Sequence, residues 1–292
     1  MTCEFLVLGS TGMLGQALLK EIKQRNNTVV GVARKKADIC MDITNDKQLL
    51  EVIEEINPKI IINTVAIVDL SYCEENPSQC YLCNSRVSLI LSKYCALNKK
   101  KYVYISTDHY FTGDQDRKHS EAHPVNLCNE YAMTKYIGER LSLVNDNALV
   151  VRTNIVGFRH DEKSLSFLEW AIKALENKEH MNLFDDFYTS SIDVRSFSKA
   201  LCDLIDKDVN GIINLASSEV SNKKTFIETL AKQLGLSLAN TNGCPMSQNT
   251  GIVKRNESLG LDVLKAEEIL GYSLPTLLEV VNNLVREYRN GE

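Results

Sequence analysis

The sequence predicts an α/β protein with a doubly wound, Rossmann-type parallel sheet and a smaller C-terminal region. The first half of the chain alternates short, wholly apolar runs with longer amphipathic stretches. That alternation is typical of parallel strands whose two faces are both buried by helices. The first apolar run also leads directly into a glycine-rich turn that opens the first amphipathic stretch, as the first strand of a Rossmann fold does.

Each element is predicted from the spacing of its apolar residues. The expected strands of the sheet are 3–8, 28–33, 59–63, 101–105 and 148–152. The expected helices between and after them are 13–24, 48–56, 78–98 and 127–144. Right-handed crossovers between parallel strands then place helices on both faces of the sheet.

The alternation becomes irregular after Arg152. Helices are expected at 164–177, 194–205, 223–234 and 277–289, with one further strand at 211–215. We therefore divide the chain into an NADP-binding Rossmann domain and a second region. The Rossmann domain covers residues 1–153 and is expected to be completed by about residues 193–215. The second region covers residues 154–192 and 216–292, and we interpret it as the part that binds the substrate.

Composition and charge exclude several classes of protein. The 292 residues are 44% hydrophobic and 24% charged, which is ordinary for a globular protein. A net charge of -5 argues against a nucleic acid or an anionic membrane as the partner. The apolar runs are far shorter than the ~20 residues that cross a bilayer, and the N-terminal run lacks the flanks of a signal peptide. We expect a soluble, cytoplasmic protein.

The nine cysteines predict neither a disulfide framework nor a metal site. Their number is odd and their spacing irregular, so reduced thiols are expected. Cys80 and Cys83 form a Cys-x-x-Cys pair, but a zinc site needs a second close pair, and the sequence has none. No metal is expected.

A Gly-x-x-Gly-x-x-Gly motif runs from Gly9 to Gly15 at the end of the first expected strand. Glycines let the backbone turn tightly and approach a pyrophosphate, which then lies at the positive N-terminal end of the next helix. A dinucleotide site is therefore expected here, with a tight turn that holds no ligand as the alternative. The residues expected to contact the cofactor are Gly9, Thr11, Gly12, Met13 and Leu14.

The end of the second expected strand indicates which dinucleotide is bound. Arg34 stands where an acidic residue would accept hydrogen bonds from the adenosine ribose. Because an arginine pairs instead with a 2′-phosphate, NADPH is favoured over NADH, and a solvated basic turn is the alternative. Asp42 and Ile43 are expected to flank the adenine, with the carboxylate accepting a hydrogen bond from its amine.

Tyr131 and Lys135 are spaced so that both lie on one face of the helix expected at 127–144. A nearby ammonium group lowers the pKa of a phenol, and a tyrosine tuned in this way can give a proton to a ketone oxygen while hydride reaches the carbon. Thr107 follows the fourth expected strand, at the edge of the sheet where ligands bind, and can hold the same oxygen. For Thr107, a hydroxyl that satisfies a turn is the alternative.

The chain resembles the extended short-chain dehydrogenase/reductase family, and within it the branch of dTDP-4-dehydrorhamnose reductase. The resemblance extends along nearly the whole chain. It rests on residues 9–15, Asn63-Thr64-Val65-Ala66, residues 104–108, Phe111-x-Gly113, Tyr131 with Lys135, Gly138-Glu139 and residues 151–153.

The resemblance implies an enzyme that reduces the C4 ketone of a nucleotide-linked 4-keto-6-deoxy sugar for surface polysaccharide synthesis. It implies a catalytic triad of Thr107, Tyr131 and Lys135, the last two also contacting the cofactor, and a homodimer. Further cofactor contacts are implied at Thr64, Val65 and Ala66. The expected substrate contacts are Val68, Asp108, His109, Asn154 and Ile155.

Departures from the family pattern leave the sugar open. Dehydratases of the superfamily usually carry a glutamate where this chain has His109, so a dehydratase is disfavoured. The reductases typically carry a tryptophan where this chain has Ile155, so the sugar is not predicted. Two other functions remain as alternatives: a sugar-nucleotide epimerase on the same scaffold, and a non-catalytic NADP-binding regulatory subunit resembling that of methionine adenosyltransferase.

Overall fold

The computed structural model describes residues 3–161, 164–246 and 253–291, and the chain divides into two compact units. The first unit comprises Met1–Thr107, Leu127–Arg152 and Ser198–Ile213. The second unit comprises Asp108–Asn126, Thr153–Phe197 and Asn214–Glu292.

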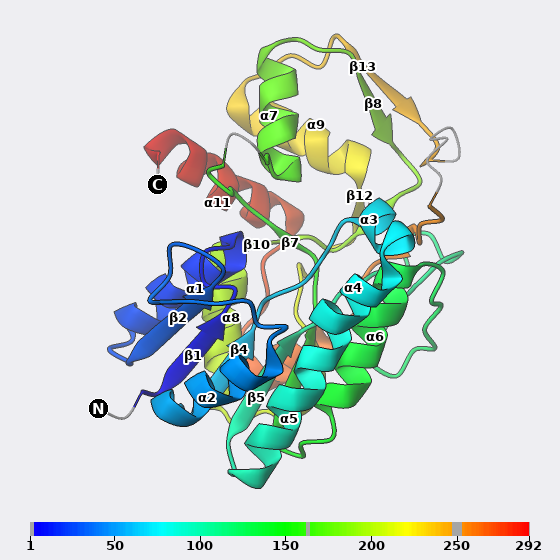
Figure 1. The fold of residues 1–292 in the computed structure, drawn as a ribbon. Coiled ribbons are helices and arrows are strands. Elements are labelled where there is room, and N and C mark those ends of the chain that lie inside the picture. The colour runs from blue at the N-terminus through cyan, green and yellow to red at the C-terminus, as the bar shows by residue number, and fades with distance from the viewer. Residues whose placement is uncertain (1–2, 162–163, 247–252, 292) are drawn as a thin grey trace. The chain divides into compact units, whose positions relative to one another are not determined.

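The first unit is built on a seven-stranded sheet in the order β11-β6-β5-β4-β1-β2-β3 (Figure 1). Its strands are β1 (Phe5–Leu8), β2 (Val29–Ala33), β3 (Ile39–Cys40), β4 (Ile60–Asn63), β5 (Lys101–Ile105), β6 (Ala148–Arg152) and β11 (Gly211–Asn214). The strands from β6 to β3 in this order all pair in parallel. Because β2 and β4 lie on opposite sides of β1, the order reverses there, as in a doubly wound fold. The predicted fold class is confirmed.

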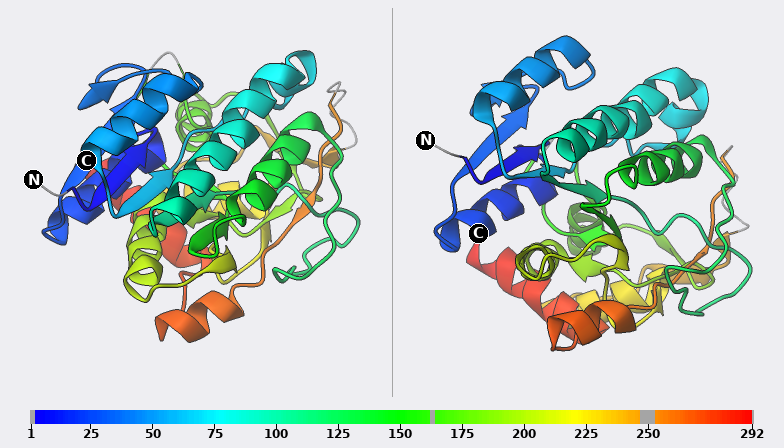
Figure 2. Two further views of the ribbon diagram at one scale, coloured as in Figure 1. Left: turned by 60° about the horizontal axis from the view of Figure 1, so that its bottom comes forward. Right: turned by 90° about the horizontal axis from the view of Figure 1, so that it is seen from below.

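Helices cover both faces of this sheet (Figure 2). One face is covered by α2 (Asp46–Ile56), α5 (Val87–Leu97) and α6 (Glu130–Ser142). The other is covered by α1 (Met13–Gln24) and α8 (Val194–Asp206). Leucines and isoleucines of β1 and α2 pack together in the core with almost no exposed surface. Apolar strands flanked by amphipathic helices therefore give the layered arrangement that the sequence predicts.

The helix expected at 78–98 is interrupted in the structure. It consists of α4 (Pro77–Tyr81), a π-helical turn η1 (Leu82–Arg86) and α5, and it is preceded by a short helix α3 (Leu70–Glu75). Asn76 and Pro77 separate α3 from α4, since a proline fits the first turn of a helix and not its interior. The apolar periodicity alone does not reveal the π-helical turn, because its residues remain helical.

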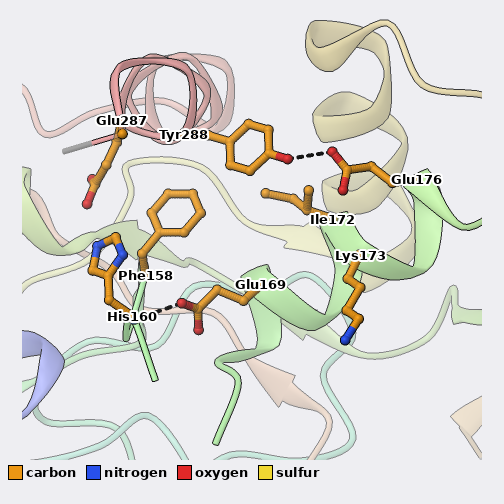
Figure 3. Close-up of a pocket in the computed structure, with 9 residues that line it drawn as sticks. Phe158, His160, Glu169, Ile172, Lys173, Glu176, Glu287 and Tyr288 are labelled. Carbon is orange, nitrogen blue, oxygen red and sulfur yellow. Dashed lines mark hydrogen bonds between the residues drawn. The ribbon is translucent and has the colours of Figure 1, made fainter. Parts of the chain in front are cut away.

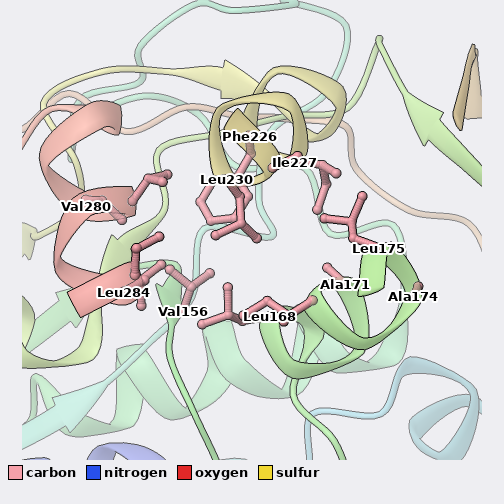
Figure 4. Packing of buried hydrophobic residues seen from close by; sticks show 14 of the residues in the cluster. Val156, Leu168, Ala171, Ala174, Leu175, Phe226, Ile227, Leu230, Val280 and Leu284 are labelled. Atoms are coloured by element: carbon pink, nitrogen blue, oxygen red, sulfur yellow. The ribbon is translucent and has the colours of Figure 1, made fainter. Parts of the chain in front are cut away.

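The second unit combines helices with several short sheets. Its elements are β7 (Ile155–Val156), α7 (Phe167–Glu176), β8 (Met181–Phe184), β9 (Tyr188–Thr189), β10 (Ile192–Asp193), β12 (Ser221–Asn222), α9 (Lys223–Leu234), β13 (Thr241–Cys244), β14 (Ser258–Leu259), α10 (Leu264–Leu270) and α11 (Leu277–Asn290). Figure 4 shows its core, in which Leu168 of α7, Leu230 of α9 and Leu284 of α11 converge. In the described part of the chain, every helix is too short or too polar to cross a membrane.

Residues 108–126 belong to the second unit, although the sequence analysis placed them in the Rossmann domain. The backbone N–H of His119 donates to the carbonyl of Gly260 at 2.9 Å, and the Thr112 hydroxyl donates to the Glu257 carboxylate at 2.7 Å. The expected boundary differs because these partners are more than a hundred residues away in the sequence.

Cys73 and Cys80 form a disulfide, with a Cα–Cα distance of 5.6 Å. The expectation that all thiols are reduced is therefore wrong for this pair. The turn between α3 and α4 brings the two residues within the range that a disulfide spans, and the sequence spacing does not show this turn. The other seven cysteines take part in no disulfide among the described residues.

Candidate active site

The glycine-rich turn lies between β1 and α1 and has no room for side chains at two positions. Gly9 has a φ of +85°, and a Cβ atom there would lie 2.5 Å from Thr64 Oγ1. A Cβ atom at Gly15 would lie 2.1 Å from the carbonyl oxygen of Gly9. Gly12 caps α1 without a side-chain hydrogen bond, so the first backbone N–H groups of the helix remain available for an anion.

This turn fits a dinucleotide pyrophosphate. Thr11 and Gly12 are exposed, and Met13 and Leu14 are half-buried, so the turn is accessible from solvent. The close approach of backbone at Gly9 is the feature that a bound pyrophosphate requires. The residues expected to contact the cofactor at this turn are therefore brought together.

The three residues expected around the adenosine follow β2 and differ in how far they are exposed. Arg34 is exposed and its charge acts on the carboxylate of Asp42. Two hydrogen bonds from Thr44, from its backbone N–H and its hydroxyl, lower the pKa of Asp42. Ile43 is only 5% exposed and packs in the core of the first unit. The geometry thus offers Arg34 and Asp42 to a ligand more readily than Ile43.

The residues after β4 are held by the sheet itself. Thr64 donates its hydroxyl hydrogen bond to the carbonyl of Leu8 at 2.7 Å, which joins the ends of β4 and β1. The N–H of Val65 donates to the side chain of Asn63. Ala66 is half-buried and Val68 is 57% exposed. These positions lie directly after a central strand of the sheet, at the edge where dinucleotides bind in such folds.

Tyr131 and Lys135 lie one turn apart on α6, and both are buried. The Nζ of Lys135 donates to the carbonyl of Ile105 at 2.6 Å, two residues before Thr107. It also lies 4.2 Å from the centre of the Tyr104 ring, a cation–π distance. The three predicted catalytic residues thus share one region of the first unit, at the end of β5 and the face of α6.

Burial lowers the pKa of Lys135 to about 7. The side chain is 2% exposed, and a buried ammonium group loses the hydration that stabilises its charge. Its proton is therefore exchanged near neutral pH. Strongly shifted pKa values gather at functional sites, so this shift makes Lys135 and the neighbouring Tyr131 candidates for proton transfer.

Two hydrogen bonds and an ion pair fix α6 to its neighbours. Ser85 donates to the carbonyl of Thr134 at 2.6 Å. Arg152 pairs with Glu139 at 2.5 Å, with both side chains almost fully buried, and Ser106 donates to the same carboxylate. In the sequence, Glu139 and Arg152 are only parts of family motifs, and their pairing is not predicted.

In the second unit, the expected substrate residues Asp108 and Asn154 are joined directly. The Asn154 amide donates to Asp108 Oδ2 at 2.8 Å, and Ser191 donates to the Asn154 amide oxygen at 2.8 Å. Ile155 is placed in β7, where it pairs with Ile192 of β10.

His109 lies in an electropositive part of the second unit. Burial, together with the smaller effect of the charges of Lys223 and Arg255, lowers its pKa to about 4. Burial also lowers the pKa of Lys223 to about 8, while Asp108 raises it. Lys223 is not predicted from the sequence, because nothing in its local sequence links it to His109, which lies 114 residues earlier. Two cations near a neutral imidazole form an environment suited to an anionic ligand.

A separate pocket of about 400 Å³ lies in the second unit between α7 and α11 (Figure 3). Phe158, Ile172 and Tyr288 form its apolar part, and Tyr288 donates a hydrogen bond to Glu176. None of the predicted cofactor, catalytic or substrate residues lines it. We therefore do not assign the predicted chemistry to this pocket.

Comparisons with known proteins agree on one family. The family model described as the RmlD substrate binding domain matches residues 3–290. The probable low-salt glycan biosynthesis reductase Agl14 of Haloferax volcanii is 26% identical over 280 residues, which are 93% of either chain. Methionine adenosyltransferase 2 subunit beta of Xenopus laevis is 31% identical over 157 residues, which are 52% of this chain and 46% of that protein.

A solved structure extends this likeness to the fold. The dTDP-4-dehydrorhamnose reductase of Bacillus anthracis in complex with NADP superposes with a TM-score of 0.88 at 22% identity. The superposition covers 98% of this chain and 100% of that one.

Proposed function

Because the chain belongs to the family of the RmlD substrate binding domain, we propose that it is an NADPH-dependent sugar-nucleotide reductase. Its substrate would be a nucleotide-linked 4-keto-6-deoxy sugar, reduced at the C4 ketone, in the synthesis of a surface polysaccharide. The observation that carries the proposal is the hydrogen bond from Lys135 Nζ to the carbonyl of Ile105. Lys135 lies one helical turn from Tyr131, and Ile105 lies two residues before Thr107, so this bond links the elements that carry the three catalytic candidates. The printed names of relatives, a glycan biosynthesis reductase among them, support the same reaction class.

The turn from Gly9 to Leu14 would hold the pyrophosphate, and Arg34 the 2′-phosphate of the adenosine ribose. The solved relative that binds NADP supports this cofactor. When bound, the nicotinamide supplies the hydride. The side chains of the first unit would transfer a proton to the ketone oxygen and orient the carbonyl group.

Tyr131 would donate the proton to the ketone oxygen. The ammonium form of Lys135 would stabilise the phenolate that remains and would hold the nicotinamide ribose. The Thr107 hydroxyl donates a hydrogen bond to the same oxygen and orients the carbonyl. Asp108, His109, Asn154, Ile155 and Val68 remain proposed contacts of the sugar nucleotide, and Lys223 and Arg255 join them as candidates for its diphosphate.

The test is the oxidation of NADPH by the purified protein with a panel of 4-keto-6-deoxy sugar nucleotides. One member of the panel should be turned over. Tyr131→Phe should lower kcat by about 10²–10⁴-fold, the usual contribution of a positioned proton donor. Tyr136→Phe, which removes a hydroxyl from the same helix, is the matched control and should keep its activity.

Two other outcomes would replace the proposal. Conversion of a sugar nucleotide without net oxidation of NADPH would indicate an epimerase. Tight NADPH binding without turnover of any sugar, together with activation of a methionine adenosyltransferase, would indicate a regulatory subunit, in line with the similarity to subunit beta. The homodimer implied by the resemblance stays a prediction, which light scattering of the purified protein can check.

A further inference from the structure

Three electron-pair donors converge in the second unit, apart from the residues of the proposed reaction. Asp114, His119 and His123 each place a potential ligand atom within 4.8 Å of the other two. Asp114 Oδ2 lies 3.2 Å from His119 Nε2 and 3.7 Å from His123 Nε2. The His119 side chain is fully buried, whereas the other two are partly exposed, so an ion from solvent can reach the cluster.

The hydrogen bonding of His119 determines which of its nitrogens carries a proton. Its Nδ1 lies 2.8 Å from the carbonyl oxygen of Gly260, which can only accept a hydrogen bond, so Nδ1 carries a hydrogen. In the neutral imidazole, Nε2 then presents a lone pair to the carboxylate of Asp114. Two acceptors 3.2 Å apart need a positive centre between or beside them.

A proton on His119 would satisfy one of these contacts but not the whole cluster. His123 directs a second nitrogen at the same carboxylate oxygen, and the two imidazole rings have their centres 4.6 Å apart. Arg117 adds a third positive group, with Nη1 3.6 Å from Asp114 Oδ2. One proton bridges only two of these atoms, whereas one metal ion accepts electron pairs from both imidazoles and the carboxylate.

We infer that Asp114, His119 and His123 form a binding site for a divalent transition-metal ion of the zinc class. One divalent ion accepts electron pairs from two neutral imidazoles and one carboxylate, which is an established ligand set for zinc with a fourth position left for water. Tetrahedral bonds of about 2.0–2.2 Å place ligand atoms about 3.3–3.6 Å apart, and the observed 3.2 and 3.7 Å lie on either side of that range. Arg117, whose side chain is 59% exposed, can swing into solvent.

The surroundings hold the ligands in place. The Gly260 carbonyl fixes the tautomer of His119, as outer partners of metal-bound histidines do. The ring of Phe111 stacks on that of His119 at 4.2 Å and 2°, which fixes its plane. All three ligands come from one short segment of ten residues, so little chain entropy is lost when the site closes. The ion would fasten the segment 108–126, which carries the proposed substrate contacts Asp108 and His109.

This site differs from the expectation of no metal, which did not weigh the histidines. The signal that could have revealed it is Asp-x-x-x-x-His-x-x-x-His, with two histidines four residues apart. The pattern is weak by itself, because histidines at this spacing are common. Only the fold shows that a buried nitrogen faces the carboxylate.

The test is a calorimetric titration of the chelator-treated full-length protein with Zn²⁺, repeated with Co²⁺ and followed by visible absorption. We expect one equivalent of Zn²⁺ to bind and the melting temperature to rise, since an ion that binds only the folded state stabilises it. His123→Gln should weaken binding by more than about 10-fold, because even outer partners of metal ligands contribute 10–100-fold. Asp114→Asn should do the same, and both variants should keep the fold, because neither side chain is fully buried.

His180→Gln is the matched control, since His180 is exposed and lies outside the cluster. This variant should bind Zn²⁺ like the wild type. Absence of binding to the wild type would overturn the inference, and so would equal affinity of wild type and His123→Gln. A sulfur-to-cobalt charge-transfer band would assign the ion to free cysteines and would overturn it as well. Because the titration contains no sugar nucleotide or NADPH, its result does not depend on the proposed reaction.

Discussion

Replacing Lys135 with methionine tests whether burial of this ammonium group destabilises the folded protein. Lys135 is 2% exposed, and its Nζ lies 2.6 Å from the carbonyl oxygen of Ile105. Burial lowers its pKa from 10.5 to about 7. Methionine has a similar length and no charge, so Lys135→Met removes the titrating group while nearly conserving its volume.

The size of the effect follows from this pKa. Below about pH 7 the lysine is protonated in both the folded and the unfolded protein, and its contribution to the pH dependence is nil. Between about pH 7 and its ordinary pKa of 10.5, the folded protein has lost the proton and the unfolded chain keeps it. Rising pH therefore stabilises the folded state by about 1.4 kcal/mol per unit, or about 2–3 kcal/mol from about pH 7 to about pH 9.

The assay is urea unfolding followed by circular dichroism at several pH values, on protein free of NADPH, since a bound ligand would add its own stabilisation. The free energy of unfolding of the wild type should rise relative to that of Lys135→Met as the pH increases. Lys93→Met, at an exposed position of α5, is the matched control and should follow the wild type. The lost hydrogen bond to Ile105 changes the free energy of unfolding by the same amount at every pH. The test is therefore the slope of that free energy against pH. A difference that stays flat from about pH 6 to about pH 9 would refute the reasoning.

Three further predictions concern the first unit. Gly15→Ala should destabilise the protein by about 1–3 kcal/mol and weaken NADPH binding in a fluorescence titration, because its Cβ would lie 2.1 Å from the Gly9 oxygen; unchanged affinity would contradict this. Glu139→Gln should cost about 3–5 kcal/mol in urea unfolding, because Arg152 is left buried without its carboxylate; a loss below about 1 kcal/mol would contradict it. Arg34→Ala should lower the affinity for NADPH and leave that for NADH unchanged; an equal loss for both would remove Arg34 from the 2′-phosphate site.

The parallel sheet is predictable because its strands are buried on both faces. Residues 60–63 and 101–105 are apolar almost throughout, and only a strand covered by helices on both sides tolerates such a run. The disulfide, the π-helical turn and the membership of residues 108–126 are not predictable in this way. They depend on contacts between segments that are distant in the sequence or on a turn that leaves no periodic signal.

The residues of the candidate site form the same two groups, those that a local pattern predicts and those that it does not. The glycine turn and the Tyr131 and Lys135 pair are local patterns, so the sequence contains all the information needed to find them. Lys223 near His109 and Gly260 beside His119 are tertiary neighbours from distant segments, so no local pattern identifies them. A single sequence therefore predicts the functional residues within one helix or turn better than the neighbouring residues that shift their pKa values or fix their orientation.

The π-helical turn explains how α6 is held in position. Asn84 and Ser85 of this turn contact Thr134 of α6, through an amide hydrogen bond of 3.2 Å and a hydroxyl hydrogen bond of 2.6 Å. Gly138 allows the close approach, since a Cβ atom there would lie 2.3 Å from the Asn84 carbonyl oxygen. A π-helical turn carries one extra residue, which redirects side chains relative to a regular helix and is frequent at functional sites.

The position of Lys135 therefore depends on two elements and not on α6 alone. A regular helix across residues 82–86 would rotate Asn84 and Ser85 away from α6 and release the contacts at Thr134, next to Lys135. The burial that lowers the pKa of Lys135 requires that α6 lies close against both this turn and β5. Changes at Ser85 should accordingly alter the pH dependence of stability that Lys135 produces, although Ser85 never contacts the ammonium group.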